Sequence, residues 1–386
     1  MRIFVLGAGA TGSLIARLLV RQGHQVTCGD RDPVRARRFL GRKSAVPIRP
    51  VNARNLWSIV NAARGSHMIV NASPAVVNKI VLRAALRLRA HYLDTASHQT
   101  ETPFRAEQLR FDRQFQAKNR AAVINAGVAP GLTNLLVARA AEVLDGLEAV
   151  QVRLYESTGS DEPVSQWSSD SAFDEAVSRP PVYRHGRFRF GQRFGEREVF
   201  RFPRPIGPAG VVLAAQDEVV TLPRFLKLRE LDVKIGGNDF ERLRRLYRQG
   251  KLRRSRGPAA ARFPQTPTPR QVEKLVARGA LYHARFAAAV VARGRKNDRH
   301  ALVRLDATFP SLYQIRRREV YTSPIAWATA HMAALFVKHF PRGSPGVHPP
   351  ETLPARTRQA ILAGVRAYGI RIGTRLTLLK PVDDEE

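Results

Sequence analysis

The first third of the chain alternates short apolar runs with longer segments in which apolar residues recur every three or four positions. The short runs predict buried strands at residues 3–6, 25–28, 45–51, 67–70, 92–93 and 122–124. The longer segments predict helices at residues 13–20, 33–40, 56–63, 77–90, 105–118 and 134–144. Strands that alternate with helices are typical of an α/β protein with a doubly wound parallel sheet.

The pattern changes near residue 146. Strands are predicted at 149–155, 211–222, 231–235, 282–292 and 301–309, with a hairpin turn at 294–298. Helices are predicted from Thr268-Pro269 to 278 and from Ser323-Pro324 to 340, because a capping residue followed by proline is a common helix start. We therefore expect three parts: residues 1–134, a second α+β domain with a mixed sheet at 135–322, and helices and a strand at 323–386 that return to the first domain.

A glycine loop, GAGATG at residues 7–12, joins the first predicted strand to the first predicted helix. Gly7 allows a tight turn, Gly9 lets a pyrophosphate approach bare backbone, and Gly12 lets the helix pack close to the strand. The amides of Ala10 and Thr11 then face the phosphates from the helix start. This context predicts a Rossmann dinucleotide-binding domain, and the alternative is an ordinary strand–helix turn.

The second predicted strand ends at Asp30, about 20 residues beyond the loop, where an acid binds the ribose hydroxyls. Such an acid repels a 2′-phosphate and favours NAD, whereas Arg31 could turn toward that phosphate, so NADP is possible. Other cofactor contacts are predicted at the ends of the third and fourth strands. These residues are Asn52, Ala53, Asn71, Ala72 and Ser73. For Asn52 and Ala53, a plain turn is an equal alternative.

Candidate catalytic residues follow the fifth and sixth strands, at the sheet edge where open α/β sheets bind ligands. Asp94 could accept or order an amine proton, or it could cap the following turn. His98 could act as a proton acceptor near neutral pH, or it could be a solvated loop residue. Asn125 could hydrogen-bond a substrate or the nicotinamide amide, and Gly127 could keep the backbone near the cofactor, with turn geometry as its alternative.

Composition changes the picture mainly through charge. The 386 residues include 64 Lys and Arg against 32 Asp and Glu, a net charge of +32. Basic clusters at 31–43 and 242–256 resemble no nucleic-acid module, so functional nucleic-acid binding is not favoured over a basic solvated surface. The single cysteine, Cys28, excludes a disulfide framework, and no metal-ligand spacing occurs. With no signal peptide or membrane span evident, we expect a cytoplasmic protein.

Three stretches resemble the saccharopine dehydrogenase superfamily, and within it the lysine 6-dehydrogenase-like branch. They are GAGATG at 7–12, NAGVAPGLTN at 125–134 and PGVHPPETL at 345–353. Weaker likeness runs through YLDTASH at 92–98, QWSSDSAFDE at 166–175 and DEVVTLPRF at 217–225. Two positions depart from the family pattern. Asn125 stands where relatives commonly have an acid, and residues 156–159 replace a glycine-rich turn.

The resemblance implies a nicotinamide cofactor and oxidation of the CH–NH group of an amino acid such as lysine or saccharopine, in a homo-oligomer. It also implies a substrate-facing segment that contains Trp167, Ser168 and Glu175, and Arg224 as a candidate for holding a substrate carboxylate. The main alternative is a catalytically altered, strongly basic Rossmann protein that binds nucleic acid or an acidic partner. A third possibility is an oxidoreductase for a lipid-like or polyketide-like substrate.

Overall fold

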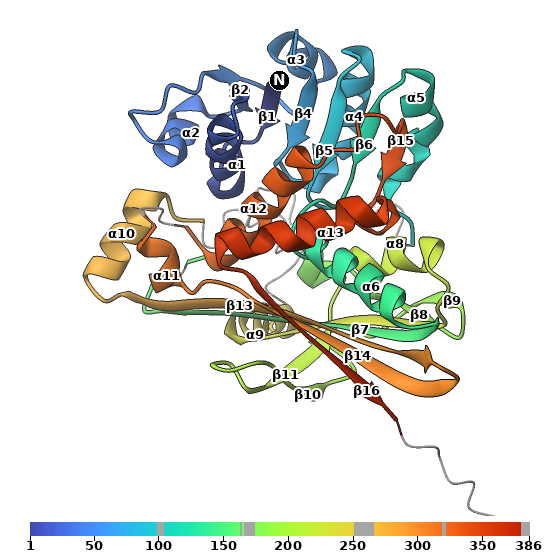
Figure 1. Cartoon of the computed structure of the whole chain (residues 1–386). Helices are drawn as coiled ribbons and strands as arrows, with labels where there is room; N and C mark the ends of the chain where they lie inside the picture. Colours follow the sequence, from blue (N-terminus) through green and yellow to red (C-terminus); the bar gives the residue numbers. More distant parts are fainter. Residues whose placement is uncertain (99–103, 163, 166–173, 251–265, 319–321, 380–386) are drawn as a thin grey trace, which may run out of the picture.

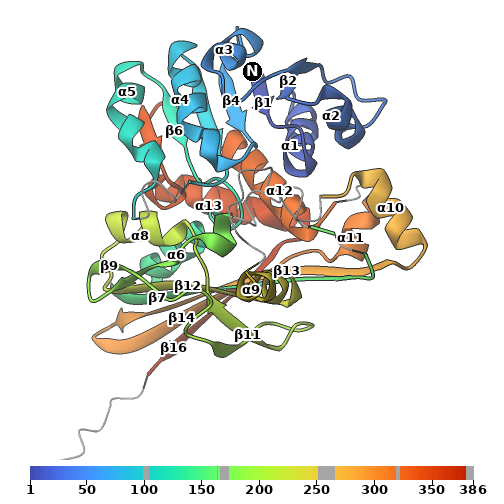
Figure 2. The ribbon, with the colours of Figure 1, turned by 180° about the vertical axis from the view of Figure 1, so that it is seen from behind.

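The computed structural model describes residues 1–98, 104–162, 164–165, 174–250, 266–318 and 322–379 (Figure 1). Two β-sheets lie one above the other, and the helices α12 (Pro324–Lys338) and α13 (Ala355–Gly364) run between them (Figures 1 and 2). The architecture is the predicted α/β fold with a second, mixed-sheet part.

In the described part of the chain, the first sheet has seven parallel strands in the order β15-β6-β5-β4-β1-β2-β3. They are β1 (Arg2–Leu6), β2 (Gln25–Asp30), β3 (Ile48–Pro50), β4 (Met68–Asn71), β5 (His91–Asp94), β6 (Ala121–Val123) and β15 (Gly346–His348). The order reverses beside β1, which is the point where doubly wound sheets bind ligands.

Helices cover both faces of this sheet because its strands are apolar on both sides. Ile3 and Val5 of β1 pack in one hydrophobic cluster with α1 (Ala10–Arg21), α2 (Pro33–Leu40) and α12. Phe4 and Leu6 point to the opposite face, where they pack with α3 (Leu56–Ala62), α4 (Asn78–Arg87) and α5 (Asp112–Ala117). The alternation follows from the two-residue period of a strand.

The second sheet has the order β10-β11-β12-β7-β13-β14-β16, with the β8–β9 hairpin attached to β12. Its β7–β12 pair is parallel and its other pairs are antiparallel, as predicted for a mixed sheet. The strands are β7 (Gly146–Ser160), β8 (Pro181–Arg184), β9 (Arg187–Phe190), β10 (Glu198–Arg201), β11 (Pro208–Leu213), β12 (Glu230–Gly236), β13 (Leu281–Lys296), β14 (Arg299–Thr308) and β16 (Arg371–Leu378).

The other helices lie next to the second sheet or in the segments that connect the two sheets. They are α6 (Leu132–Val143), α8 (Glu218–Phe225), α9 (Asn238–Arg248), α10 (Pro269–Ala277) and α11 (Leu312–Arg316), with 3-10 turns η1 (Ala75–Val77), η2 (Glu107–Phe111), η4 (Pro350–Thr352) and η5 (Val365–Tyr368). The predicted hairpin turn narrows to Asn297 and Asp298, both with positive φ, as in a two-residue turn.

The predicted strand at 211–222 is wrong. Strand β11 ends at Leu213, and helix α8 begins at Glu218. Residues 211–222 are buried throughout, so their apolar run could not separate a strand from a helix by periodicity. Within residues 323–386, β15 joins the first sheet whereas β16 pairs with β14 of the second. The domain boundaries at 134/135 and 322/323 therefore stay a proposal.

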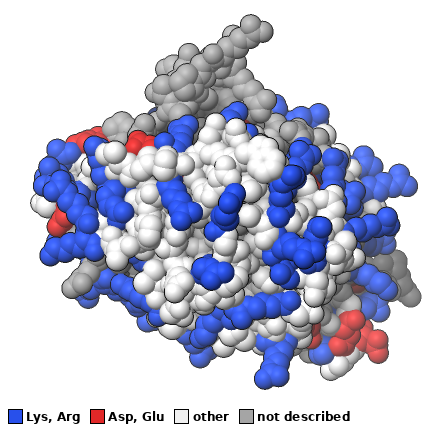
Figure 3. All heavy atoms as spheres, turned by 90° about the horizontal axis from the view of Figure 1, so that it is seen from above, with Lys and Arg blue, Asp and Glu red and all other residues white. Residues whose placement is uncertain are grey.

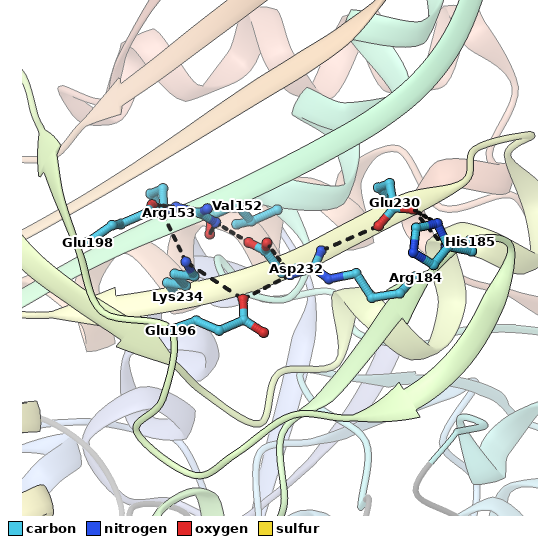
Figure 4. A network of polar contacts seen from close by, with 9 residues as sticks. All are labelled: Val152, Arg153, Arg184, His185, Glu196, Glu198, Glu230, Asp232 and Lys234. Carbon is cyan, nitrogen blue, oxygen red and sulfur yellow. Dashed lines mark hydrogen bonds and ion pairs between the residues drawn. The ribbon is translucent and has the colours of Figure 1, made fainter.

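A network of ion pairs joins the strands at the centre of the second sheet (Figure 4). Arg153 of β7 is fully buried and donates to Asp232 of β12 and to Glu198 of β10. Asp232 also accepts a 2.8 Å bond from Arg184 Nη2, and Lys234 Nζ donates to Glu198 Oε2 at 2.8 Å. The buried guanidinium is thus balanced by carboxylates from neighbouring strands.

Asp232→Asn is expected to lower the free energy of unfolding by about 3 kcal/mol, because it leaves two arginines short of one buried carboxylate. Urea denaturation would measure the change. Arg278→Ala is the control, since it breaks an exposed pair with Glu162 and should cost less than about 1 kcal/mol. Equal losses in the two variants would contradict a special role for the network.

Candidate active site

The glycine loop forms the turn between β1 and α1, and each of its glycines has a different environment. Gly7 has φ +87°, and a Cβ there would lie 2.8 Å from the Ala72 carbonyl oxygen. A Cβ on Gly12 would lie 1.8 Å from the carbonyl oxygen of Gly7, so helix and strand need a glycine at this contact. A Cβ on Gly9 would meet no atom within 4 Å. The backbone at Gly9 is therefore open, as a cradle for a diphosphate requires.

No side chain caps the start of α1 at Gly9, so the loop leaves the first amides of the helix available to an anionic ligand. The Asp30 carboxylate holds the loop from β2. Its Oδ2 accepts a 2.8 Å bond from the Ala8 amide and its Oδ1 accepts a 3.0 Å bond from the Asp32 amide, while the adjacent Arg31 is exposed. These contacts bring the loop and the predicted ribose-binding acid together.

An open cleft lies at the carboxyl ends of the first sheet, with a volume of about 1250 Å³ including the part open to solvent. It begins beside the glycine loop and continues past β5 to the helix start at α8. Its described lining comprises Thr11, residues 72–75, residues 95–98, Ala129, Pro130, Asp174, Glu175, Ser178, residues 215–217, Ile325, Ala326 and Thr329. Four predicted site residues line it, namely Thr11, Ala72, Ser73 and His98, together with Glu175 of the predicted substrate-facing segment.

The end of the cleft away from the glycine loop is acidic. His98 is buried, and its Nδ1 lies 4.0 Å from Asp174 Oδ2. Gln216 Nε2 donates to Glu175 Oε1. Burial and, to a smaller extent, the nearby Glu218 and Asp217 carboxylates raise the pKa of Glu175 to about 8, although the hydrogen bond from Gln216 lowers it. A cation placed here would relieve the repulsion between these carboxylates.

Asp94 and Asn125 lie under this lining. Asp94 is buried, and its carboxylate accepts bonds from Tyr92 Oη at 2.9 Å, Gln108 Nε2 at 3.0 Å and the Asn125 amide at 2.8 Å. Ser97 Oγ donates to Asn125 Oδ1 at 2.8 Å, and the Ser97 amide donates to Asp217 Oδ2 at 2.8 Å. The chain of bonds fixes the β5 loop against α8. Asp94 itself does not line the described cleft, so its predicted role in accepting or ordering an amine proton stays a prediction.

Asn125 has φ +56° and a fully buried side chain whose Nδ2 has no hydrogen-bond partner among the described residues. A buried donor without a partner, next to the cleft-lining Ser97, is consistent with a bound ligand whose oxygen accepts this hydrogen bond. Together with the open backbone at Gly9, it fits the dinucleotide that the loop predicts.

Other predicted site residues have structural partners within the fold, and their predicted cofactor contacts stay predictions. Gly127 packs against Pro130 and Thr95, since its Cβ would lie 3.0 Å from each carbonyl oxygen. Asn71 accepts from the Ser73 amide at 3.2 Å, which shapes the turn after β4. The Asn52 amide donates to Ser58 Oγ at 3.0 Å, and Asn52 and Ala53 precede α3 as a plain turn.

Arg224 does not line the described cleft. Its Nη2 donates to the Phe104 carbonyl at 2.8 Å, and its guanidinium lies 5.2 Å from the Phe188 ring centroid. It therefore joins α8 to neighbouring segments. Trp167 and Ser168 lie outside the described residues.

Residues 3–123 match the family model described as the saccharopine dehydrogenase NADP binding domain. The first, strand–helix part of the chain is therefore similar to that domain. A sequence search of curated proteins finds no match.

Apo saccharopine dehydrogenase (L-Glu forming) from Saccharomyces cerevisiae has a similar fold, with a TM-score of 0.70 and 11% identity over 97% of this chain and 99% of that one. A C. glutamicum DAP dehydrogenase in complex with DAP gives a TM-score of 0.47 and 12% identity, covering 95% and 98%. A mutant meso-DAP dehydrogenase from Clostridium tetani with DAP gives 0.44 and 10%, covering 92% and 95%.

The motifs that carry the superfamily resemblance meet in three dimensions. Thr133 Oγ1 donates to Glu218 Oε1 at 2.6 Å. Asn134 Nδ2 donates to Thr221 Oγ1 at 3.2 Å and to Glu351 Oε2 at 3.0 Å. The NAGVAPGLTN motif thus fastens α8 and the PPET turn to the start of α6, and its last two residues serve structure.

Sequence reasoning missed Gln216 and Asp217 as cleft residues because it placed them inside a strand. The polar triplet Gln216-Asp217-Glu218 within an apolar run was the available signal, since an acid before a helical segment indicates a helix start. Glu175 was predicted only within the substrate-facing segment, because no periodic pattern marks its position.

Among the described residues, no three His, Cys, Asp or Glu side chains gather closely enough to hold a metal ion. In the same part of the chain, none of the helices has the length and apolar character needed to cross a bilayer.

The buried acids predict that stability falls as the pH rises from 7 to 8.5. Burial raises the pKa of Asp94 and of Glu218 to about 7, and that of Glu175 to about 8. The folded protein therefore keeps protons that the unfolded chain has already lost, and it loses this advantage as the pH passes 7 to 8. The histidines with lowered pKa values titrate below this window.

Urea unfolding at pH 7 and pH 8.5 would measure a decrease of about 1 kcal/mol or more. Glu175→Gln should flatten the dependence because it removes the acid with the highest of these pKa values. A free energy of unfolding that rises over this range would contradict the burial of neutral acids.

Proposed function

We propose that this protein is an NAD(P)-dependent oxidoreductase that acts on the CH–NH group of a cationic amine such as lysine or saccharopine, as in the lysine 6-dehydrogenase-like branch. One observation carries the proposal: a single cleft extends from Thr11 of the glycine loop to a group of carboxylates that includes Asp174, Glu175 and Asp217. An ammonium group is attracted to that acidic end, and a diphosphate to the other.

The proposed roles follow from position. The amides around Gly9 would hold the diphosphate of the cofactor. When bound, the nicotinamide ring would serve as the hydride acceptor. Asp174 and Glu175 would orient the substrate ammonium, and His98 would accept the amine proton. Asp94 is a positioning residue, because its three hydrogen bonds fix the loop that carries His98. Asn125 Nδ2 would donate to the ligand.

The nucleotide is proposed as NAD, with NADP possible. The Asp30 carboxylate lies at the end of β2 beside the loop, where it would repel a 2′-phosphate. The NADP description of the matching family model and the exposed Arg31 support the second nucleotide. A cytoplasmic homo-oligomer is proposed with the same activity, by analogy with such enzymes.

A substrate panel tests the proposal. The purified protein is mixed with NAD or NADP and with L-lysine, saccharopine or a diamine, and the absorbance of the reduced cofactor is followed. Formation of reduced cofactor with one amine supports the proposal, and the same amine should be inactive with Gly9→Leu. Reduction with none of these amines by a protein that binds the cofactor would reject this substrate class.

A further inference from the structure

The amino ends of the first sheet, opposite the cleft, carry a second hollow of about 830 Å³ that opens to solvent. Its lining includes four arginines and two histidines, contributed by β1, β5 and the loops before β4, β5, β6 and β15. The basic lining residues are Arg2, Arg89, Arg120, Arg342, His67 and His91. The described lining contains no Asp or Glu. We call this set the basic hollow.

The face around the basic hollow is the upper one in Figure 1. Seen from above, it carries many Lys and Arg side chains and few Asp and Glu (Figure 3). Many of the side chains that give the protein its net charge of +32 therefore lie on this face. One strand length, roughly 15 Å, separates this face from the cleft, so the two sites are distinct.

Main-chain carbonyls hold two of the arginines in place. Arg2 Nε donates to the Gly65 carbonyl at 2.6 Å. Arg120 donates through Nε to the Arg89 carbonyl and through Nη1 to the Asn119 carbonyl at 2.7 Å. These bonds leave Nη2 of Arg120 unused, and they neutralise no charge. The arginines are thus oriented in advance without an acidic partner.

The other two arginines have no such anchor. Within the described residues, the guanidinium groups of Arg89 and Arg342 make no hydrogen bond or ion pair. Burial lowers the pKa of His91, and the charges of Arg120 and Arg342 lower it further. Like charges therefore crowd around this hollow, and an anion would relieve the repulsion.

We propose that the basic hollow binds clustered phosphate groups, supplied either by a free polyphosphate or nucleotide or by the backbone of a nucleic acid. Arginine suits this ligand because its planar fork of N–H donors matches phosphate oxygens. This inference does not rest on the proposed dehydrogenase activity, since it concerns the other end of the sheet.

Binding of inorganic triphosphate and of a 12-nucleotide single strand would be measured on the full chain, by calorimetry and fluorescence anisotropy, at several salt concentrations. Arg89→Gln and Arg342→Gln should each lower the affinity for the probe about tenfold. For the oligonucleotide, each should also reduce the slope of log affinity against log salt concentration by about 1. Arg299→Gln, an exposed arginine on the distant β13–β14 hairpin, is the matched control.

Triphosphate binding alone would identify a small phosphorylated ligand, and oligonucleotide binding would identify nucleic acid. Gly9→Leu, which changes the cleft and not the basic hollow, should leave either affinity unchanged, which separates the two sites. Absence of binding by both probes overturns the proposal. Equal losses in Arg89→Gln and Arg299→Gln also overturn it, because they would show attraction by diffuse charge only.

Discussion

Gly9→Leu is expected to reduce dinucleotide affinity by roughly 100-fold or more while leaving the fold intact. A Cβ at Gly9 would meet no protein atom within 4 Å, so a side chain can leave the backbone there without a clash at its first atom. That open space is the one in which a diphosphate would contact the amides of the loop. Two lost hydrogen bonds to a charged group, at about 1.5–3 kcal/mol each, account for this loss. Fluorescence titration with NADH and thermal unfolding would measure affinity and stability together.

Gly12→Ala provides the contrast within the same loop. Its Cβ would lie 1.8 Å from the Gly7 carbonyl oxygen, so the strand and the helix must separate. We expect this variant to lose stability as well as affinity. The account of the loop would be contradicted if Gly9→Leu bound NADH as the wild type does, or if it unfolded as readily as Gly12→Ala.

Glu175→Gln is expected to lower kcat/KM by roughly 100-fold on the amine substrate. The carboxylate lies at the acidic end of the cleft, and removing one partner of the charge pair that it would form with the substrate ammonium costs about 2–5 kcal/mol. Glutamine keeps an oxygen that can accept the bond from Gln216, so the fold should persist. Steady-state kinetics on the amine found in the panel would measure the change.

The pH profile gives this variant a second signature. Because burial raises the pKa of Glu175 to about 8, only part of the wild type carries the carboxylate charge at pH 7. We expect kcat/KM to increase as the pH passes through 8 in the wild type, and this limb to be absent in Glu175→Gln. Glu241→Gln, on the partly exposed surface of α9, should keep both the rate and the limb. An unchanged profile in Glu175→Gln would remove Glu175 from the substrate site.

The parallel sheet could be predicted from sequence because its strands and helices differ in both period and length. The glycine loop was also predictable from its glycine spacing, because a Cβ at Gly7 or Gly12 would overlap backbone atoms and Gly9 leaves backbone open for a diphosphate. Strand β16 escaped prediction because its residues are mostly exposed and carry no apolar run. Its place is set by pairing with β14.

The site was less predictable than the fold because its acidic end is assembled from segments distant in sequence. Glu175 and Asp217 lie 42 positions apart in the chain, and no local pattern indicates that they share a cleft. Asp94 was correctly predicted to lie at a strand end. The three hydrogen bonds that its carboxylate accepts depend on the folded structure, so the sequence pattern could not predict them. A strand-end acid in a sequence does not reveal whether it faces the ligand or holds the loop beneath it.

The central claim is that bare amides of the glycine loop hold a dinucleotide at the entrance of the cleft. Titration of the wild-type protein with NADH and with NADPH, followed by the fluorescence of the reduced nicotinamide, tests it most directly. The account predicts saturable binding of at least one nucleotide, with NADH the tighter. Absence of binding by both nucleotides would contradict it.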